Sequence, residues 1–174
     1  MNDKKRQNLG KDCTYVAVFV ALTIAAQLCL SFLPGVEVVT VLFVAFSFAF
    51  GCRMGLMAAT VFSLLRQFLF GFFPTVLILY LIYYNLIALL FGFLGKWKGL
   101  SLKKIVALTA LSCVCTVCFT LLDNIITPLW YGYSGKVFRL YFMASLSVMA
   151  PQVICTAISV GVLFFPLVKI FQRL

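Results

Sequence analysis

The chain has no histidine, and its only carboxylates belong to Asp3, Asp12, Glu37 and Asp123. Zinc and di-iron sites draw their ligands from histidine, cysteine and clustered carboxylates. The usual ligand sets for these metals therefore cannot be assembled, which excludes an intramembrane metalloprotease. The loop Gly-x-x-x-x-Gly-Lys-Ser/Thr, which cradles nucleotide phosphates, is also missing. We expect no cofactor, no metal and no enzymatic activity here, and any use of ATP must come from a partner.

Charge is scarce throughout the sequence, which excludes a soluble globular protein. Only 10% of the 174 residues are charged and 64% are hydrophobic, whereas soluble domains are roughly half apolar and about a quarter charged. The formal charge of +10 does not indicate nucleic-acid binding, because the basic residues lie in short segments between apolar runs. The composition predicts an integral membrane protein.

The apolar runs predict a bundle of six transmembrane helices in a single all-α domain. Breaks at Pro34-Gly35, Gly51, Gly71 to Pro74 and Pro128 divide the chain, since glycine and proline end helices. Residues 1–12 form a basic cytoplasmic tail. Because no Ala-x-Ala cleavage site follows the first apolar run, we expect a retained helix and not a signal peptide. The expected spans are 13–33, 36–50, 54–70, 75–94, 105–127 and 140–168.

Lysine and arginine are distributed very unevenly between the two sides of this topology. Cytoplasmic loops retain positive charge, and one side holds eleven basic residues whereas the other holds only Lys136 and Arg139. This count predicts that both termini are cytoplasmic and that the number of spans is even. The expected location is a prokaryotic cell membrane, which the chain crosses several times.

Polar side chains inside hydrocarbon are costly and need a partner or a wet cavity. In the predicted topology most of them share the outer half of the membrane, which favours a cavity that opens outward: Gln27, Glu37, Arg66, Gln67, Asp123 and Asn124. The fifth span adds a stripe from Thr109 to Thr127, and the fourth carries Tyr80, Tyr83 and Tyr84. The alternative is that the serine and threonine hydroxyls only bond their own helix or join helices.

Arg66 has two interpretations. Near the outer end of its span, it can extend its guanidinium to the lipid headgroups. Alternatively it faces inward and pairs with Asp123, with Glu37 or with an anionic group of a ligand.

The first span has two distinct faces. Ala17, Ala21 and Ala25 repeat every four residues, and such a small-residue surface lets another helix approach closely. It serves either internal packing or a partner protein. Thr23, Gln27 and Ser31 lie on another face, which is suited to lining a site. The seven cysteines include Cys115-x-x-Cys118, but without a basic neighbour to activate a thiol we interpret them as packing residues.

Taken together, these features resemble the substrate-binding S component of energy-coupling factor (ECF) transporters, which import vitamins and related micronutrients. The resemblance covers nearly the whole chain and lies in the alanine repeat, in the segment from Leu33 to Thr40, in the turn from Phe50 to Gly55 and in the segment from Phe70 to Pro74. No single motif is strong, but their order and spacing are those of the family.

The resemblance implies a subunit that captures its substrate outside the cell and works with a membrane coupling protein and two cytoplasmic ATPases. The alanine repeat would contact the coupling protein. The resemblance places the substrate against Tyr80, Tyr84, Asp123, Thr127, Trp130 and Gln152, and depth in the membrane adds Glu37, Arg66 and Gln67. Aromatic rings and hydroxyls together favour a small heterocycle. The alternatives are a membrane scaffold without a ligand and a small solute channel.

Overall fold

The computed structural model describes residues 3–32, 38–96 and 101–173, with side chains described from Gly10 onward. The described chain is all-helical and contains no strand. Its six helices are α1 (Asp3–Leu30), α2 (Val39–Phe50), α3 (Cys52–Phe70), α4 (Pro74–Leu94), α5 (Leu102–Tyr131) and α6 (Gly135–Phe171). The predicted fold class is therefore confirmed at the level of helix content.

Four helices are long and apolar enough to cross a membrane, namely α1 from Gly10 onward, α4, α5 and α6. Large apolar side chains are exposed on these helices, among them Val18, Leu22 and Val106. Water would disfavour such surfaces, whereas hydrocarbon accepts them. The chain therefore has the character of a multi-pass membrane protein.

Helix α2 forms the centre of the molecule. Every residue from Val39 to Phe48 is buried, as expected for a helix that is apolar on all sides. Its 12 residues span only about 18 Å at 1.5 Å per residue. Helices α4 and α6 pack on α2, and its rings Phe43 and Phe46 contact Phe19 of α1 at centroid distances of 5.2 and 4.0 Å.

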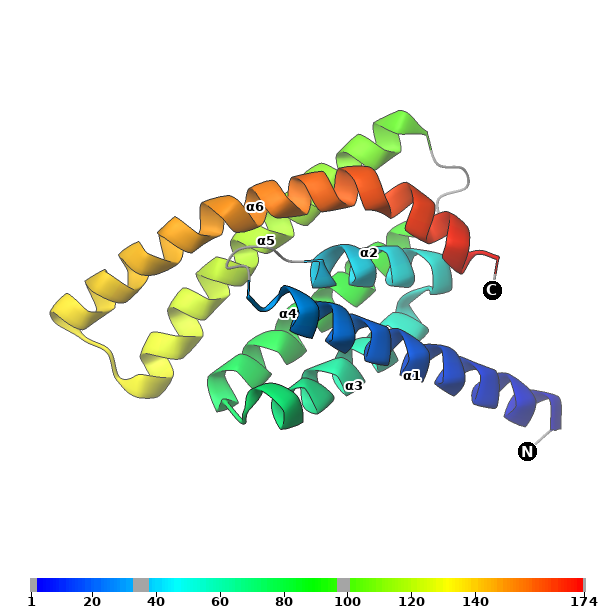
Figure 1. The fold of residues 1–174 in the computed structure, drawn as a ribbon, viewed down its shortest axis with the longest axis horizontal. Coiled ribbons are helices and arrows are strands. Elements are labelled where there is room, and N and C mark those ends of the chain that lie inside the picture. The colour runs from blue at the N-terminus through cyan, green and yellow to red at the C-terminus, as the bar shows by residue number, and fades with distance from the viewer. Residues whose placement is uncertain (1–2, 33–37, 97–100, 174) are drawn as a thin grey trace.

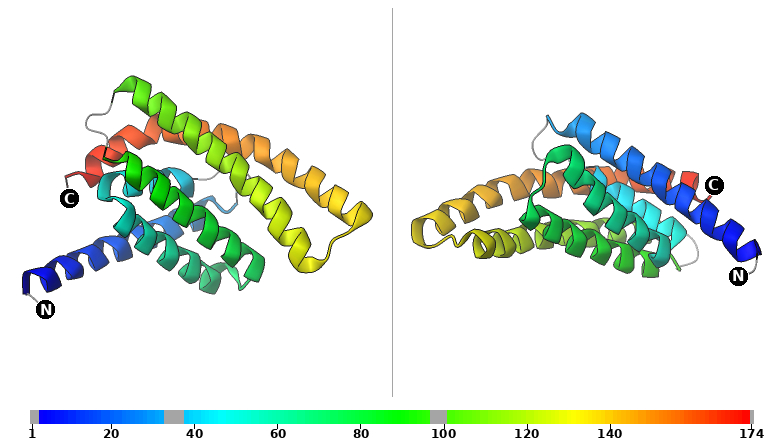
Figure 2. Two further views of the ribbon diagram at one scale, coloured as in Figure 1. Left: turned by 180° about the vertical axis from the view of Figure 1, so that it is seen from behind. Right: turned by 90° about the horizontal axis from the view of Figure 1, so that it is seen from below.

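The remaining helices form two hairpins. Helix α3 packs on α4, and α5 packs on α6, with the second hairpin extending beyond the others (Figure 1). Both described ends of the chain lie at the same end of the molecule in all three views (Figures 1 and 2). The turn between α5 and α6 lies at the opposite end. Consecutive helices thus run back and forth along the molecule.

Glycines set two of the predicted breaks. Gly51 separates α2 from α3 with φ of 84°, and Gly71 follows α3 with φ of 92°. Residues with a side chain rarely adopt such angles, so the sequence located these turns correctly. The break at Pro34-Gly35 lies outside the described residues.

Two predicted features around the last turn are wrong. Helix α5 does not end at Pro128 but continues to Tyr131, where Gly132 adopts a left-handed conformation with φ of 65°. A proline inside a helix costs one backbone hydrogen bond, which membrane helices tolerate. The predicted loop from Trp130 to Arg139 is also mostly helical, because α6 already begins at Gly135.

Candidate functional site

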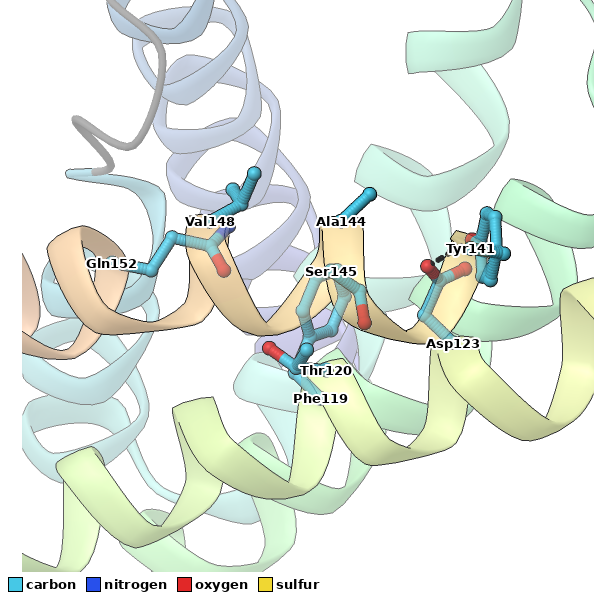
Figure 3. Close-up of a pocket in the computed structure, with 8 residues that line it drawn as sticks. All are labelled: Phe119, Thr120, Asp123, Tyr141, Ala144, Ser145, Val148 and Gln152. Carbon is cyan, nitrogen blue, oxygen red and sulfur yellow. Dashed lines mark hydrogen bonds between the residues drawn. The ribbon is translucent and has the colours of Figure 1, made fainter. Parts of the chain in front are cut away.

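A groove between α5 and α6 gathers polar side chains in the half of that hairpin nearer its turn. Its cavity has a volume of about 280 Å³. Figure 3 shows that Asp123 and Tyr141 lie at one end, Gln152 lies at the other, and Phe119 and Thr120 lie between them. The remaining lining residues are Ala144, Ser145 and Val148.

Below the groove, the polar stripe of α5 fastens the two helices together. Ser112, Thr116 and Thr120 are buried, and the Thr116 hydroxyl lies 3.0 Å from that of Thr156 on α6. The hydroxyls of Thr109, Ser112 and Thr116 also donate to carbonyl oxygens one turn earlier at 2.9, 2.9 and 3.1 Å. From Thr109 to Thr116, the hydroxyls of this stripe therefore bond their own helix or join α5 to α6.

Asp123 is the polar centre of the groove. The Thr127 hydroxyl donates to its Oδ1 at 2.7 Å, and the Tyr141 hydroxyl donates to its Oδ2 at 2.5 Å. The ring of Tyr133 packs edge-on against Tyr141 at a centroid distance of 5.7 Å. Neighbouring hydroxyls and rings therefore hold the carboxylate in place.

Asn124 supports the same region from the buried side of α5. Its Oδ1 accepts a hydrogen bond of 2.7 Å from Ser145, which lines the groove. Its Nδ2 is buried and has no hydrogen-bond partner among the described residues. A buried amide with an unused donor is unusual in a folded protein. The packing here therefore leaves the N–H groups of Asn124 available beside the groove.

A second polar cluster lies on α1, α3 and α4. The guanidinium carbon of Arg66 lies 4.5 Å from the ring centroid of Tyr80 and 4.7 Å from that of Phe70. Gln27 donates from Nε2 to the Tyr80 hydroxyl at 3.4 Å. The Oε1 of Gln67 accepts a hydrogen bond of 3.2 Å from the backbone N–H of Phe73.

This second cluster also contains unused polar atoms. Oε1 of Gln27, Nε of Arg66 and Nε2 of Gln67 are buried without a hydrogen-bond partner among the described residues. Within those residues, no ion pair joins Arg66 to Asp123, whose oxygens are bonded to Thr127 and Tyr141. The predicted contact of Arg66 with Glu37 lies outside the described residues.

Phe119 connects the two clusters. Its ring lines the groove and lies 5.9 Å from the centroid of Tyr80 and 4.7 Å from that of Tyr83. Arg66 packs on the same Tyr80 ring. The polar residues that the sequence placed at one depth therefore form two neighbouring clusters separated by aromatic rings.

The other predicted site residues lie at various distances from the groove. Asp123 and Gln152 line it, and Thr127 reaches it through Asp123. Tyr84 is fully buried in the core against Phe43 and Phe62. Trp130 is exposed in the last turn of α5. Glu37 lies outside the described residues.

Tyr141 was missed by the sequence interpretation, although the sequence contains a signal for it. Tyr141, Ser145, Val148 and Gln152 are spaced by four, three and four residues, which places them on one helical face. All four line the groove. The predicted loop up to Arg139 hid this pattern, because it left Tyr141 at the start of a helix.

The alanine repeat of α1 lies on the surface. Ala17, Ala21 and Ala25 are exposed, while Val16, Val20 and Ile24 face the core. Of the two interpretations, the one in which these alanines pack inside the bundle is therefore wrong. The opposite face behaves as predicted only in part: Thr23 is buried and bonds the carbonyl of Phe19 at 2.8 Å, and Ser31 is exposed.

The cysteines form neither a disulfide nor a metal site within the described residues. No disulfide joins any of the seven, and no group of three or more potential ligands occurs in the described part of the chain. Comparison of the chain with known protein families, with curated proteins and with solved structures gives no match.

Proposed function

We propose that this chain is the membrane-embedded, substrate-binding S component of an ECF-type importer in a prokaryotic cell membrane. It binds a vitamin or a related small heterocycle at the outer side. It then delivers this solute inward together with a membrane coupling protein and two ATPases.

The groove between α5 and α6 is the observation that carries the proposal. It brings the carboxylate of Asp123 together with Gln152 and aromatic rings. Small-molecule sites combine apolar walls with a few placed polar groups. A scaffold without a ligand has no need for an open polar groove.

The arrangement of the helices supports the proposed topology of six crossings. One end of the molecule holds both described chain ends and the α2–α3 turn (Figure 1). The last turn of α4 and the first turn of α5 lie at the same end. Most lysines and arginines belong to these segments, and positive charge favours the cytoplasm. The groove then belongs to the outer half.

The exposed alanine repeat supports the proposed partner. Ala17, Ala21 and Ala25 leave a shallow surface on α1, and small residues let a second helix pack closely in a membrane. The same face carries exposed Val18 and Leu22, which adds apolar contact area for a membrane-embedded coupling protein.

A transport experiment tests the proposal. The full chain is co-expressed with a coupling protein and two ATPases and reconstituted into liposomes, and mass spectrometry identifies the small molecule that co-purifies with the chain. Uptake of this molecule must require ATP and all subunits. Uptake without ATPases would indicate a channel, and the absence of any co-purified or stabilising solute would indicate a scaffold. Either result contradicts the proposal.

A further inference from the structure

We propose that the α5–α6 groove selects an organic cation, either a substituted ammonium or a positively charged nitrogen heterocycle, with Asp123 as its counter-ion. This inference rests on the proposed function and names the charge class of the substrate. It is carried by the charges, rings and dimensions of the groove.

The groove is lined by a carboxyl group and by no basic side chain. Asp123 is the only aspartate, glutamate, lysine or arginine among the residues that line it. The nearest basic residues along α6, Lys136 and Arg139, are exposed, so water and salt screen them. Arg66 is not a lining residue and packs on Tyr80 and Phe70. An anionic ligand would therefore meet repulsion at Asp123 and no opposite charge.

Among the residues that the structure describes, no basic side chain pairs with Asp123. Its partners, Thr127 and Tyr141, are neutral hydroxyls and supply one hydrogen bond to each oxygen. A carboxylate offers about four lone-pair sites, so roughly half of its acceptor capacity is unused. Within an apolar span, an ion without an opposite charge is costly. A cationic ligand with an N–H group supplies both the opposite charge and a hydrogen-bond donor for the unused acceptor sites.

Aromatic rings lie where they can stabilise such a cation. Phe119 and Tyr141 both line the groove, and Tyr133 and Tyr83 back them at centroid distances of 5.7 and 4.7 Å. The face of an aromatic ring attracts a cation within about 6 Å, most strongly when the cation is desolvated. The rings also contribute apolar area to a planar ligand.

The length of the groove indicates a second contact. Gln152 lies eleven residues after Tyr141 on α6, which corresponds to at most about 16 Å along the helix. Its amide is half-buried and makes no hydrogen bond among the described residues. With a volume of about 280 Å³, the groove suits a ligand of one or two rings. Its cationic end would lie at Asp123 and a neutral polar group at Gln152.

Three probes of matched size test the charge class. The full chain is purified in dodecyl maltoside, a neutral detergent, and its apparent melting temperature is measured with benzylammonium, benzyl alcohol and benzoate, each up to 10 mM. We expect stabilisation by benzylammonium alone, because a ligand that binds only the folded state raises apparent stability. Equal or greater stabilisation by benzyl alcohol or benzoate, or none by benzylammonium, overturns the inference.

Two substitutions locate the effect. Asp123→Asn should reduce the affinity for benzylammonium at least tenfold, whereas Asp12→Asn, the same change on α1, should leave it unchanged. Unchanged affinity in Asp123→Asn overturns the inference. If that variant does not fold, the three-probe comparison on the unaltered chain still decides.

The outcomes separate this inference from the proposed function. A neutral or anionic molecule that co-purifies and is imported with ATP refutes the cation class and leaves the importer intact. Stabilisation by benzylammonium without ATP-dependent uptake supports the cation class and refutes the importer.

Discussion

Arg66 illustrates how this bundle accommodates a cation that has no carboxylate partner among the described residues. Its guanidinium contacts the rings of Tyr80 and Phe70, and its Nε is buried without a hydrogen bond among the described residues. Ring contacts with a cation contribute about 0.5–2 kcal/mol, depending on desolvation. We infer that Arg66 stabilises the packing of α3 on α4.

Arg66→Ala is expected to lower the apparent free energy of unfolding in detergent by about 1–2 kcal/mol, because both ring contacts are lost. Arg53→Ala is the matched control, since Arg53 is exposed at the start of α3 and its loss should change stability by less than about 0.5 kcal/mol. Thermal or denaturant unfolding of both variants measures this.

A different result would favour the ligand-binding interpretation of Arg66. If Arg66→Ala leaves stability unchanged but weakens binding of the co-purified solute, the guanidinium contacts that solute directly. If the side chain of Arg66 instead extends to the lipid headgroups, Arg66→Ala should change neither the stability nor the binding of the solute.

The importance of Asp123 was predictable from the sequence, but its partner was not. A carboxylate in an apolar span needs a compensating group, which marks this residue as a candidate. Which hydroxyl supplies it depends on the register of α5 against α6, and that register is set by the short turn that begins at Gly132. Depth in the membrane similarly marked Arg66 as a candidate residue but did not predict its contact with Tyr80.

At the scale of helices, α4 approaches the start of α3 very closely at Gly92. A Cβ atom added there would lie 2.5 Å from the backbone nitrogen of Cys52 and 2.8 Å from its Sγ. These distances are far shorter than van der Waals contact, and the obstacle is backbone that cannot rotate away. The small residue therefore permits this crossing.

Gly92→Ala is expected to destabilise the protein by about 1–3 kcal/mol, the usual cost of overpacking. Gly161→Ala on α6 is the control, because a Cβ atom there would meet nothing within 4 Å. Alanine favours helix over glycine by up to about 1 kcal/mol, so this variant should be as stable as the original chain or slightly more stable. Equal behaviour of the two variants would contradict the close approach.

Helix boundaries were predictable where backbone chemistry alone determines them. Gly51 and Gly71 adopt positive φ angles that few other residues accept, so the turns beside them could be located from the sequence. Pro128 led to a wrong boundary for α5, because a proline indicates only that one backbone hydrogen bond is lost. Whether the helix then ends depends on packing, and Pro128 is buried within α5.

At the scale of the whole molecule, composition predicted the membrane environment but not the grouping of polar residues. Depth along each span follows from counting residues, whereas rotation about each helix axis follows from packing. Residues predicted to share one depth therefore fall into both the groove around Asp123 and the cluster around Arg66, with Phe119 between them. Packing also sets the rotation of α4 about its axis, which is why Tyr84 is buried in the core.

The exposed alanine repeat leads to a prediction about assembly. Ala21→Phe places a large ring in the middle of the shallow surface on α1, so a partner helix could no longer approach closely. We expect at least a tenfold loss of co-purification with the proposed coupling protein, measured by affinity purification of the co-expressed complex. Solute binding by the isolated chain should not change, because Ala21 is exposed and distant in the fold from the residues that line the groove.

Ala110→Phe is the matched control for this prediction. Ala110 is also exposed, but it lies on α5, and lipid accommodates an additional ring on that surface. The complex should therefore form normally with this variant. If both variants assemble equally well, α1 does not provide the docking surface, and the partner must bind elsewhere on the bundle. If both fail, added bulk disturbs folding in general, which the melting temperature of each isolated variant would reveal.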